Sequence, residues 1–272
     1  MIFNLSMPML KPKGPTASLT AQSGISYTNG LNGLEADVIS LFSAAISNNG
    51  AITNTTSTVY IDFDSVHRKV SVGDQVTLSL NGTNYAFDII GFNHDTLTDT
   101  VAYGEETATG KAGVTFQMHD IFAGLKYSMN NSNTNRGGWK SSAMRTSTMA
   151  TMKGYLSSDW QSIIKTVNKV AGKGGTSSSW SGTETVSDEC FLLAEIEVLG
   201  SASKSVSGEG AQYAYYMAGN SKIKNYKGSA AYWWHRSPAT GYNTSFCLTS
   251  STGGSTVVGA NTSQGVAFCF CV

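Results

Sequence analysis

The stretch Trp233-Trp234-His235-Arg236-Ser237-Pro238 decides how the last third of this chain is interpreted. Its aromatic and apolar residues are typical of a short strand, and three similar segments follow it, separated by polar turns. These segments are residues 245–249, 256–258 and 265–272. No strand–helix–strand series and no internal repeat connects them, so the pattern favours a small antiparallel β structure.

The first third of the chain is expected to contain an extended arm, one helix and then several strands. Residues 1–33 are punctuated by Pro, Gly, Ser and Thr and are expected to form an extended arm. Residues 34–46 carry apolar side chains at helical spacing and stop at Asn48-Asn49-Gly50. A single helix of this length cannot form a core alone, so it packs either on its own chain or on a neighbouring copy. Residues 58–90 then alternate as strands do, with a hairpin turn at Asn81-Gly82.

The middle third mixes both patterns. A strand is expected at 114–118, and a polar loop at 127–140 precedes a helix expected from about Ser141 to Leu156. Ile163, Val167 and Val170 fit a strand or a short helix equally well. Strands first, helices in the middle and strands last predict an α+β fold.

The composition excludes several classes of function. The chain of 272 residues has 18 Lys and Arg against 18 Asp and Glu, a formal net charge of +0, and only 13% charged residues. A neutral chain has no excess of basic groups to neutralise nucleic-acid phosphates or to hold a helix on anionic lipid. No segment reaches the ~18 apolar residues of a membrane span, and residues 1–10 lack the basic start of a secretory signal. We therefore expect no nucleic-acid partner and no membrane insertion.

The four cysteines are Cys190, Cys247, Cys269 and Cys271, and their spacing is not that of a zinc site. We expect free, buried thiols in a chain made in the cytoplasm. A disulfide from Cys247 to Cys269 or Cys271 is the alternative.

No motif supports catalysis or metal binding. His94-Asp95 and His119-Asp120 could supply metal ligands, but adjacent side chains on an extended segment point apart. Cys247 with His235 lies in apolar surroundings that disfavour a thiolate. Glu195 and Glu197, two residues apart among apolar residues, are interpreted as the polar face of a strand. We expect no catalytic residue, no cofactor and no metal site.

Recognition loops are better supported. Polar segments rich in Tyr, Ser, Asn and Gly alternate with the strands of the last 40 residues, and these residue types build adaptable binding surfaces. Ordinary hairpin turns are the alternative. The candidate ligand-binding residues in these loops are Tyr242, Asn243, Thr244, Ser251, Thr252, Asn261 and Thr262.

The closing motif also carries a family resemblance. Trp233-Trp234-His235-Arg236-Ser237-Pro238, followed by Gly265-Val266-Ala267-Phe268, resembles the end of a C-type-lectin-like domain family found in phages and prophages. That family is related in fold to formylglycine-generating enzymes and to the variable proteins of diversity-generating retroelements. Further matching blocks are Val72-Gly73-Asp74, Ile90-Gly91-Phe92-Asn93-His94-Asp95, Gly137-Gly138-Trp139, Ser142-Ala143-Met144-Arg145, Phe191-Leu192-Leu193-Ala194-Glu195-Ile196-Glu197 and Glu209-Gly210-Ala211-Gln212-Tyr213.

The resemblance implies a C-type-lectin-like domain over residues 66–272, preceded by an arm, a helix and a first strand in residues 1–65. It implies that His235 occupies a variable surface position and that residues 239–264 present the ligand site. The implied function is that of a virion structural protein, a tail-fibre or tail-tip protein that binds a host-surface glycan or protein.

The implied partners are other virion proteins, contacted through residues 1–65. Because single contacts by small polar groups are weak, we also expect several copies of the chain to act together, in a trimer. The protein would be made in the bacterial cytoplasm and displayed outside on the particle. A capsid decoration, head-fibre or minor structural protein is the alternative. An enzyme of the formylglycine-generating type, working through a cysteine, is a third.

Overall fold

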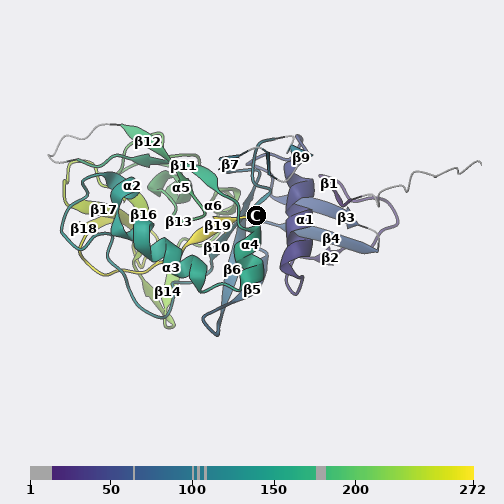
Figure 1. Ribbon diagram of the computed structural model, residues 1–272, viewed down its shortest axis with the longest axis horizontal. Helices are drawn as coiled ribbons and strands as arrows, with labels where there is room; N and C mark the ends of the chain where they lie inside the picture. Colours follow the sequence, from purple (N-terminus) through teal and green to yellow (C-terminus); the bar gives the residue numbers. More distant parts are fainter. Residues whose placement is uncertain (1–13, 64, 100, 103–104, 107–108, 176–181) are drawn as a thin grey trace, which may run out of the picture.

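The computed structural model describes residues 14–272 except 64, 100, 103–104, 107–108 and 176–181, and its fold is α+β as expected (Figure 1). Small antiparallel sheets predominate, and short helices connect them; β2 with β4 is the one parallel strand pair among the described elements. The helical elements are α1 (Ala36–Ser47), α2 (Gly138–Ser141), the π-helix η1 (Met144–Thr148), α3 (Met149–Gly154), α4 (Ser158–Ile163), α5 (Glu195–Leu199) and α6 (Ala214–Met217).

A five-stranded sheet forms the centre of the molecule. Its order is β13 (Cys190–Phe191), β19 (Cys269–Cys271), β10 (Val114–Met118), β6 (Thr83–Phe92) and β5 (Gln75–Leu80). The predicted hairpin is confirmed: Asn81 and Gly82 join β5 to β6 with φ angles of 49° and 80°. Two consecutive left-handed residues make the turn whose twist matches that of the flanking strands.

The Trp233–Pro238 motif and the two expected strands that follow it form a three-stranded sheet. β16 (Trp233–Pro238) pairs with β17 (Ser245–Thr249), which pairs with β18 (Ser255–Gly259). Every residue of β16 and β17 is buried, so this sheet is packed into the molecule along most of its length.

The remaining strands form smaller sheets. β12 (Thr183–Asp188), β11 (Val167–Gly172) and β7 (Thr96–Leu97) make a three-stranded sheet, while β14 (Lys224–Tyr226) with β15 (Ser229–Ala231) and β8 (Val101–Ala102) with β9 (Glu105–Glu106) make hairpins. The ambiguous segment near Val167 thus contains both alternatives, because α4 ends at Ile163 and β11 begins at Val167.

Two predicted elements differ in the structure. The helix expected over 141–156 is divided, since η1 adds a π turn between α2 and α3 and places Met144, Met149 and Met152 in the core. Residues 195–199 form the helix α5, so the strand expected there is wrong. Five residues span too few turns for helical periodicity to be distinguished from strand alternation.

The N-terminal unit is built around α1. Its sheet has the order β1 (Thr16–Ser18), β3 (Thr58–Phe63), β4 (Val66–Ser71) and β2 (Thr28–Asn29). Of the arm expected over 1–33, residues 1–13 lie outside the described residues, and the rest includes β1 and β2. A division after residue 65 would separate the paired strands β3 and β4, so the unit extends to Ser71.

The buried face of the helix α1 packs on its own chain. It lies between the N-terminal sheet and the central sheet (Figure 1), and Ile39, Phe42 and Ile46 are fully or almost fully buried. Ser43 Oγ donates to the carbonyl oxygen of Val272. A Cβ at Gly113 would collide with the Ser43 backbone, so glycine permits this close approach.

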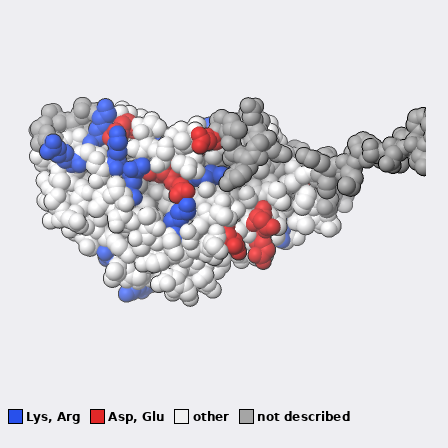
Figure 2. All heavy atoms as spheres, in the orientation of Figure 1, with Lys and Arg blue, Asp and Glu red and all other residues white. Residues whose placement is uncertain are grey.

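Two of the sheets lie towards opposite ends of the molecule. The N-terminal sheet lies at one end of the long axis, and β17 and β18 lie towards the other (Figure 1). Figure 2 shows that most of the visible surface carries no charge, with a few basic and acidic side chains gathered in groups. No helix in the described part of the chain has the length and apolar character of a membrane span.

Candidate functional site

Arg236, in the Trp233–Pro238 motif, is held in the core by a set of hydrogen bonds. Its guanidinium is fully buried and faces the Glu197 carboxylate, with Nη1–Oε2 at 2.5 Å and Nη2–Oε1 at 2.8 Å. The same group donates to the carbonyl oxygens of Val170, Leu192 and Glu209. A planar fork can satisfy a carboxylate and several carbonyls at once, which an ammonium cannot.

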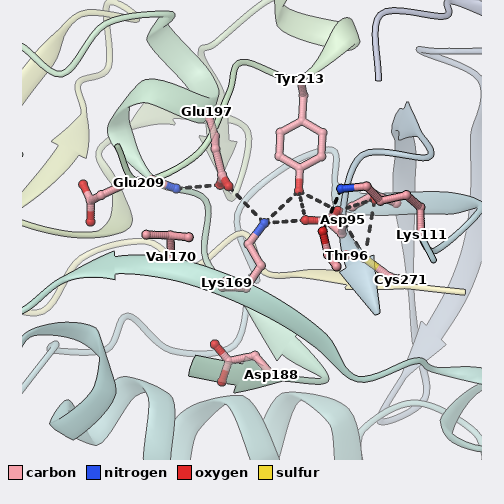
Figure 3. A network of polar contacts seen from close by, with 12 residues as sticks. Asp95, Thr96, Lys111, Lys169, Val170, Asp188, Glu197, Glu209, Tyr213 and Cys271 are labelled. Atoms are coloured by element: carbon pink, nitrogen blue, oxygen red, sulfur yellow. Dashed lines mark hydrogen bonds and ion pairs between the residues drawn. The ribbon is translucent and has the colours of Figure 1, made fainter. Parts of the chain in front are cut away.

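Lys169 on β11 extends this network towards the central sheet (Figure 3). Its Nζ lies 2.9 Å from Glu197 Oε1 and 2.5 Å from Asp95 Oδ1, and it donates to the Tyr213 hydroxyl at 3.1 Å. The Tyr213 hydroxyl donates in turn to Asp95, whose Oδ2 also accepts from Thr115 at 2.6 Å. Asp95, Lys169, Glu197, Tyr213 and Arg236 are called the buried charge network below.

The charges in the network compensate one another. Burial by itself would raise the pKa of both carboxyls, but Lys169 holds that of Asp95 well below its ordinary range, and Arg236 with Lys169 lowers that of Glu197 to about 2. Burial would lower the pKa of Lys169, but Asp95 and Glu197 raise it. Two carboxylates therefore face two cations, and all four groups are ionised at neutral pH.

Glu209 is the carboxyl next to this network without a cation of its own. Its Oε1 accepts from the Gly172 backbone N–H at 2.7 Å, while its Oε2 is buried with no hydrogen-bond partner. Burial raises its pKa to about 7. Because the two carboxylates and two cations already balance, an ionised Glu209 would add an uncompensated buried charge.

The network joins elements that are distant in the sequence, as Figure 3 shows, and it is closed to solvent. Its members come from the turn between β6 and β7, from β11, α5 and β16, and from the segment before α6. A closed, fully bonded network holds the scaffold in one arrangement and leaves no group free to meet a substrate. Within the described ranges, no cluster of three or more His, Cys, Asp or Glu side chains could hold a metal ion.

The structure divides the predicted loop residues between two ends of the β16–β18 sheet. Ser245 pairs with Gly259 at one end, and Thr249 pairs with Ser255 at the other. Ser251 and Thr252 lie in the turn at the second end, where Gly253 is next to residues 222–223. At the first end lie the distal loops, which comprise Tyr242, Asn243, Thr244, Asn261 and Thr262.

The distal loops combine exposed side chains with a fixed backbone. Tyr242 is 55% exposed, and Asn243 and Asn261 are exposed beside it in the register, whereas Thr244 and Thr262 are half-buried. The backbone of residue 260 donates to Thr244 O at 2.8 Å, which links the two loops directly. A rigid backbone with exposed Tyr and Asn is suited to binding, since little order is lost on contact.

Asn135 holds the first of the distal loops, residues 242–245, through hydrogen bonds to its backbone. Its buried Nδ2 donates to the carbonyl oxygens of Tyr242 at 2.5 Å and Ser245 at 3.1 Å, and its backbone N–H donates to Asn243 O at 3.0 Å. Its Oδ1 accepts from the Gly175 N–H at 3.3 Å. One side chain from another part of the chain therefore sets the conformation of residues 242–245.

Asn135→Ala is expected to lower the free energy of unfolding by about 2 kcal/mol, because it leaves buried carbonyl groups without donors. Denaturant titration measures this loss, and hydrogen exchange at residues 242–245 should become faster. Asn131→Ala, an exposed position in the same loop, is the matched control and should change stability by less than about 0.5 kcal/mol. Unchanged exchange in the Asn135→Ala protein would contradict this role of Asn135.

A family model, described as a domain of unknown function (DUF6273), matches residues 112–272, which is more than half of the chain. The chain belongs to the DUF6273 family. Comparisons with curated proteins and with solved structures gave no match.

The DUF6273 region does not contain all the strands of the central sheet or all the members of the buried charge network. It includes β10 to β19 and four members of the buried charge network, but Asp95 and the strands β5 and β6 precede it. The central sheet pairs β10 with β6 across this boundary. β5 and β6 are therefore structurally part of the same unit as the DUF6273 region.

The expectation that His235 lies at the surface of the DUF6273 region is wrong. His235 is fully buried on β16, where its Nε2 contacts Thr249 Oγ1 at 2.8 Å and its ring packs edge-on against Trp233. Burial lowers its pKa to about 4, so the imidazole is neutral at neutral pH. The β16 backbone directs this side chain inwards, and it cannot contact a ligand.

Glu195 and Glu197, which the sequence predicts on the polar face of a strand, are both buried on α5. Glu197 belongs to the buried charge network. Glu195 accepts from Ser203 Oγ at 2.8 Å, from the backbone N–H and Oγ of Ser205, and from Ser255 Oγ on β18. It therefore anchors the loop after α5 against the three-stranded sheet.

All four cysteines of the DUF6273 region are buried and free, which confirms the prediction and leaves no disulfide from Cys247. Burial raises the pKa of every one of these thiols. A buried thiol with a raised pKa is a poor nucleophile.

The two His-Asp pairs serve different roles. Asp95 belongs to the buried charge network, and His94 stacks on Tyr213 with ring centroids 3.7 Å apart. His119 Nδ1 contacts Asp88 at 2.9 Å, and this hydrogen bond raises the pKa of His119. Asp120 accepts from the Asn225 N–H at 2.7 Å. The two pairs are not brought together into one site.

Sequence reasoning missed Asn135 and Lys169. Lys169 could have been found, because it shares the buried face of β11 with Val167 and Ala171 at a spacing of two residues. A lysine on an apolar strand face implies a buried partner. Asn135 carries no such signal, since it lies among other asparagines in a polar loop.

Proposed function

We propose that this chain is a phage virion structural protein, a tail-fibre or tail-tip protein that attaches to a host-surface glycan or protein through the distal loops. One observation carries the proposal: these loops present exposed Tyr and Asn side chains on a backbone fixed by Asn135. Their sheet lies towards the end of the molecule opposite the N-terminal sheet (Figure 1). This arrangement suits a protein anchored at one end and binding at the other.

The resemblance of the Trp233–Pro238 motif to phage and prophage domains supports the virion assignment. A C-type-lectin-like domain is part of the same proposal. The α+β fold with small antiparallel sheets agrees with it at the coarser level.

The N-terminal unit is proposed to dock the chain to other virion proteins. Hydrogen bonds from small polar groups contribute only about 0.5–1.5 kcal/mol each. Several copies acting together, in a proposed trimer, would raise avidity by a factor of ~10²–10⁴.

A binding role is favoured over an enzyme of the formylglycine-generating type. That chemistry requires an accessible cysteine, whereas all four thiols here are buried. The alternative of a capsid decoration or minor structural protein differs from our proposal in where the distal loops lie on the particle.

The test is a triple replacement of Tyr242, Asn243 and Asn261 by alanine in the full chain. Losing three contacts of about 1 kcal/mol each should weaken binding of the labelled protein to host cells about a hundredfold. Ser251→Ala with Thr252→Ala, at the other end of the sheet, is the matched control and should bind as the unaltered chain does. Full adsorption by a folded triple variant would refute the site.

Electron cryo-microscopy of the assembled particle provides the second measurement. Distal loops exposed at a tail tip are expected. Distal loops buried against capsid neighbours would establish the decoration role instead.

A further inference from the structure

Lys169 and Asp95, in the buried charge network, form the closest contact between a lysine and a carboxylate among the described residues (Figure 3). Nζ lies 2.5 Å from Oδ1, and the two side chains are only 3% and 2% exposed. The other described lysine–carboxylate contacts are 2.8–3.0 Å long. The Lys169 ammonium also lies 4.4 Å from the centre of the Phe191 ring, so the pair is enclosed by protein.

This contact holds a nucleophile against an electrophile. An unprotonated lysine amine can attack the carbon of a carboxyl group and form an amide with it. Reacting groups held about 3–3.5 Å apart in the right orientation reach effective concentrations of ~10⁵–10⁸ M. Because Cγ is one bond beyond Oδ1, the Nζ–Oδ1 distance of 2.5 Å brings Nζ close to this range from Cγ. The fold thus supplies the proximity that amide formation lacks in water.

Three further side chains contact the atoms that would react. Asp95 Oδ2 accepts hydrogen bonds from Thr115 Oγ1 at 2.6 Å and from the Tyr213 hydroxyl at 2.8 Å. Such donors stabilise the negative charge that develops on the oxygen when its carbon is attacked. Glu197 Oε1 lies 2.9 Å from Lys169 Nζ, where a carboxylate can take a proton from the amine and pass it on.

The surrounding charges select Asp95 over Glu197 as the partner of Lys169. Both oxygens of Glu197 are held by Arg236, at 2.5 and 2.8 Å, so an amide on Glu197 would leave a buried guanidinium without its carboxylate. An amide between Lys169 and Asp95 removes one charge of each sign. Glu197 and Arg236 then remain as a balanced pair, and the desolvation cost of two buried ions is relieved.

We propose that Lys169 and Asp95 condense into an intramolecular isopeptide bond, with Glu197 as the proton carrier. One proton passes from Nζ to Oδ1 along their contact, which gives a neutral amine and a neutral carboxyl group. The Nζ electron pair then forms a bond to Cγ, and Glu197 moves a second proton from Nζ to the Oδ1 hydroxyl. The Cγ–Oδ1 bond breaks, and its electron pair leaves with Oδ1 as water. Nζ keeps its third proton, Oδ2 becomes the amide oxygen, and the Glu197 carboxylate is restored.

The reaction is slow, because Asp95 and Lys169 hold each other in the ionised state for most of the time. It needs to occur only once in each chain, and the closed core protects the amide from hydrolysis. The bond joins the turn between β6 and β7 to β11, across the start of the DUF6273 region at residue 112. This inference does not rest on the proposed attachment function.

Intact mass spectrometry of the full chain, purified and incubated overnight, tests the bond. Most molecules should be lighter than the mass calculated from the sequence by one water. Trypsin should leave the chain uncleaved after Lys169 and release a branched peptide that joins residue 169 to residue 95. Lys140→Met is the matched control, because Lys140 contacts Glu184 at 3.0 Å but is exposed. This variant should lose water as the unaltered chain does.

Two variants with balanced charges locate the reaction. Asp95→Asn with Lys169→Met removes the nucleophile, keeps an acceptor at residue 95 and should show its full calculated mass. Arg236→Met with Glu197→Gln keeps the reacting pair without the proton carrier and should lose water about a hundredfold more slowly. Circular dichroism verifies that each variant is folded.

Three results would count against these assignments. A full calculated mass for the unaltered chain would overturn the proposal. Loss of water without the branched peptide would also overturn it, because it would indicate a cyclic imide instead of a bond to Lys169. An unchanged rate in the folded variant that lacks Glu197 would overturn the role of that residue as the proton carrier.

Discussion

Replacing Arg236 by methionine is expected to lower the free energy of unfolding by about 3–5 kcal/mol, because it leaves a buried carboxylate with half of its compensation. Glu197 would keep Lys169 at 2.9 Å but lose both guanidinium contacts, and the carbonyls of Val170 and Leu192 would lose their donors. A loss of this size is a large part of the 5–15 kcal/mol that stabilises an ordinary domain. Denaturant titration followed by circular dichroism measures it.

A double-mutant cycle isolates the ion pair from the lost packing. Arg236→Met with Glu197→Gln should be less destabilised than the sum of the two single variants, by about 1–3 kcal/mol, since Asp95 and Lys169 remain as a balanced pair. Arg136→Met, an exposed arginine, is the matched control and should cost less than about 0.5 kcal/mol. An Arg236→Met loss below about 1 kcal/mol would show that the buried charge network does not hold the fold.

Replacing Glu209 by glutamine should stabilise the protein above neutral pH and change little below pH 5. Burial raises the pKa of Glu209 to about 7 in the folded chain, against an ordinary value of 4.5. Between these values the folded state holds a proton that the unfolded state has released, so stability falls as pH rises through this window. A shift of this size corresponds to about 3 kcal/mol at pH 8.

The Glu209→Gln protein keeps the acceptor for the Gly172 N–H and loses the titrating proton. Its unfolding free energy relative to the unaltered chain should therefore rise from near zero at pH 5 to about 3 kcal/mol at pH 8. Glu35→Gln, at an exposed position, is the control, and its difference should stay below about 1 kcal/mol over this range. A Glu209→Gln difference that is constant with pH would mean that Glu209 does not titrate in this window.

The parts of the fold that the sequence predicts are those determined by neighbouring residues. Asn81 and Gly82 form the expected hairpin because both can adopt left-handed φ angles. The apolar spacing over residues 34–46 likewise predicts α1, which depends on its own periodicity. Glu195 and Glu197 were misassigned because a five-residue helix and a strand have the same local pattern at that length.

The candidate sites depend on residues that are distant in the sequence. Tyr242 and Asn261 could be identified as loop residues, but only the β17–β18 register shows that Ser251 lies at the other end of the sheet. The surface position inferred for His235 failed for the same reason, since the packing of β16 decides which way its side chain points. Asp95 and Lys169 are brought together by tertiary structure alone.

The position of β19 has a consequence for how the chain folds. This strand, near residue 270, pairs with β10, near residue 116, and with β13, and it lies between these two strands in the central sheet. Until it has emerged from the ribosome, β10 and β13 have open edges facing each other. Contacts of such long sequence separation form slowly, and open edges invite pairing with other nascent chains. The central sheet is thus completed only after residue 271 has been synthesised, and the yield of folded protein depends on how fast β19 pairs with β10 and β13.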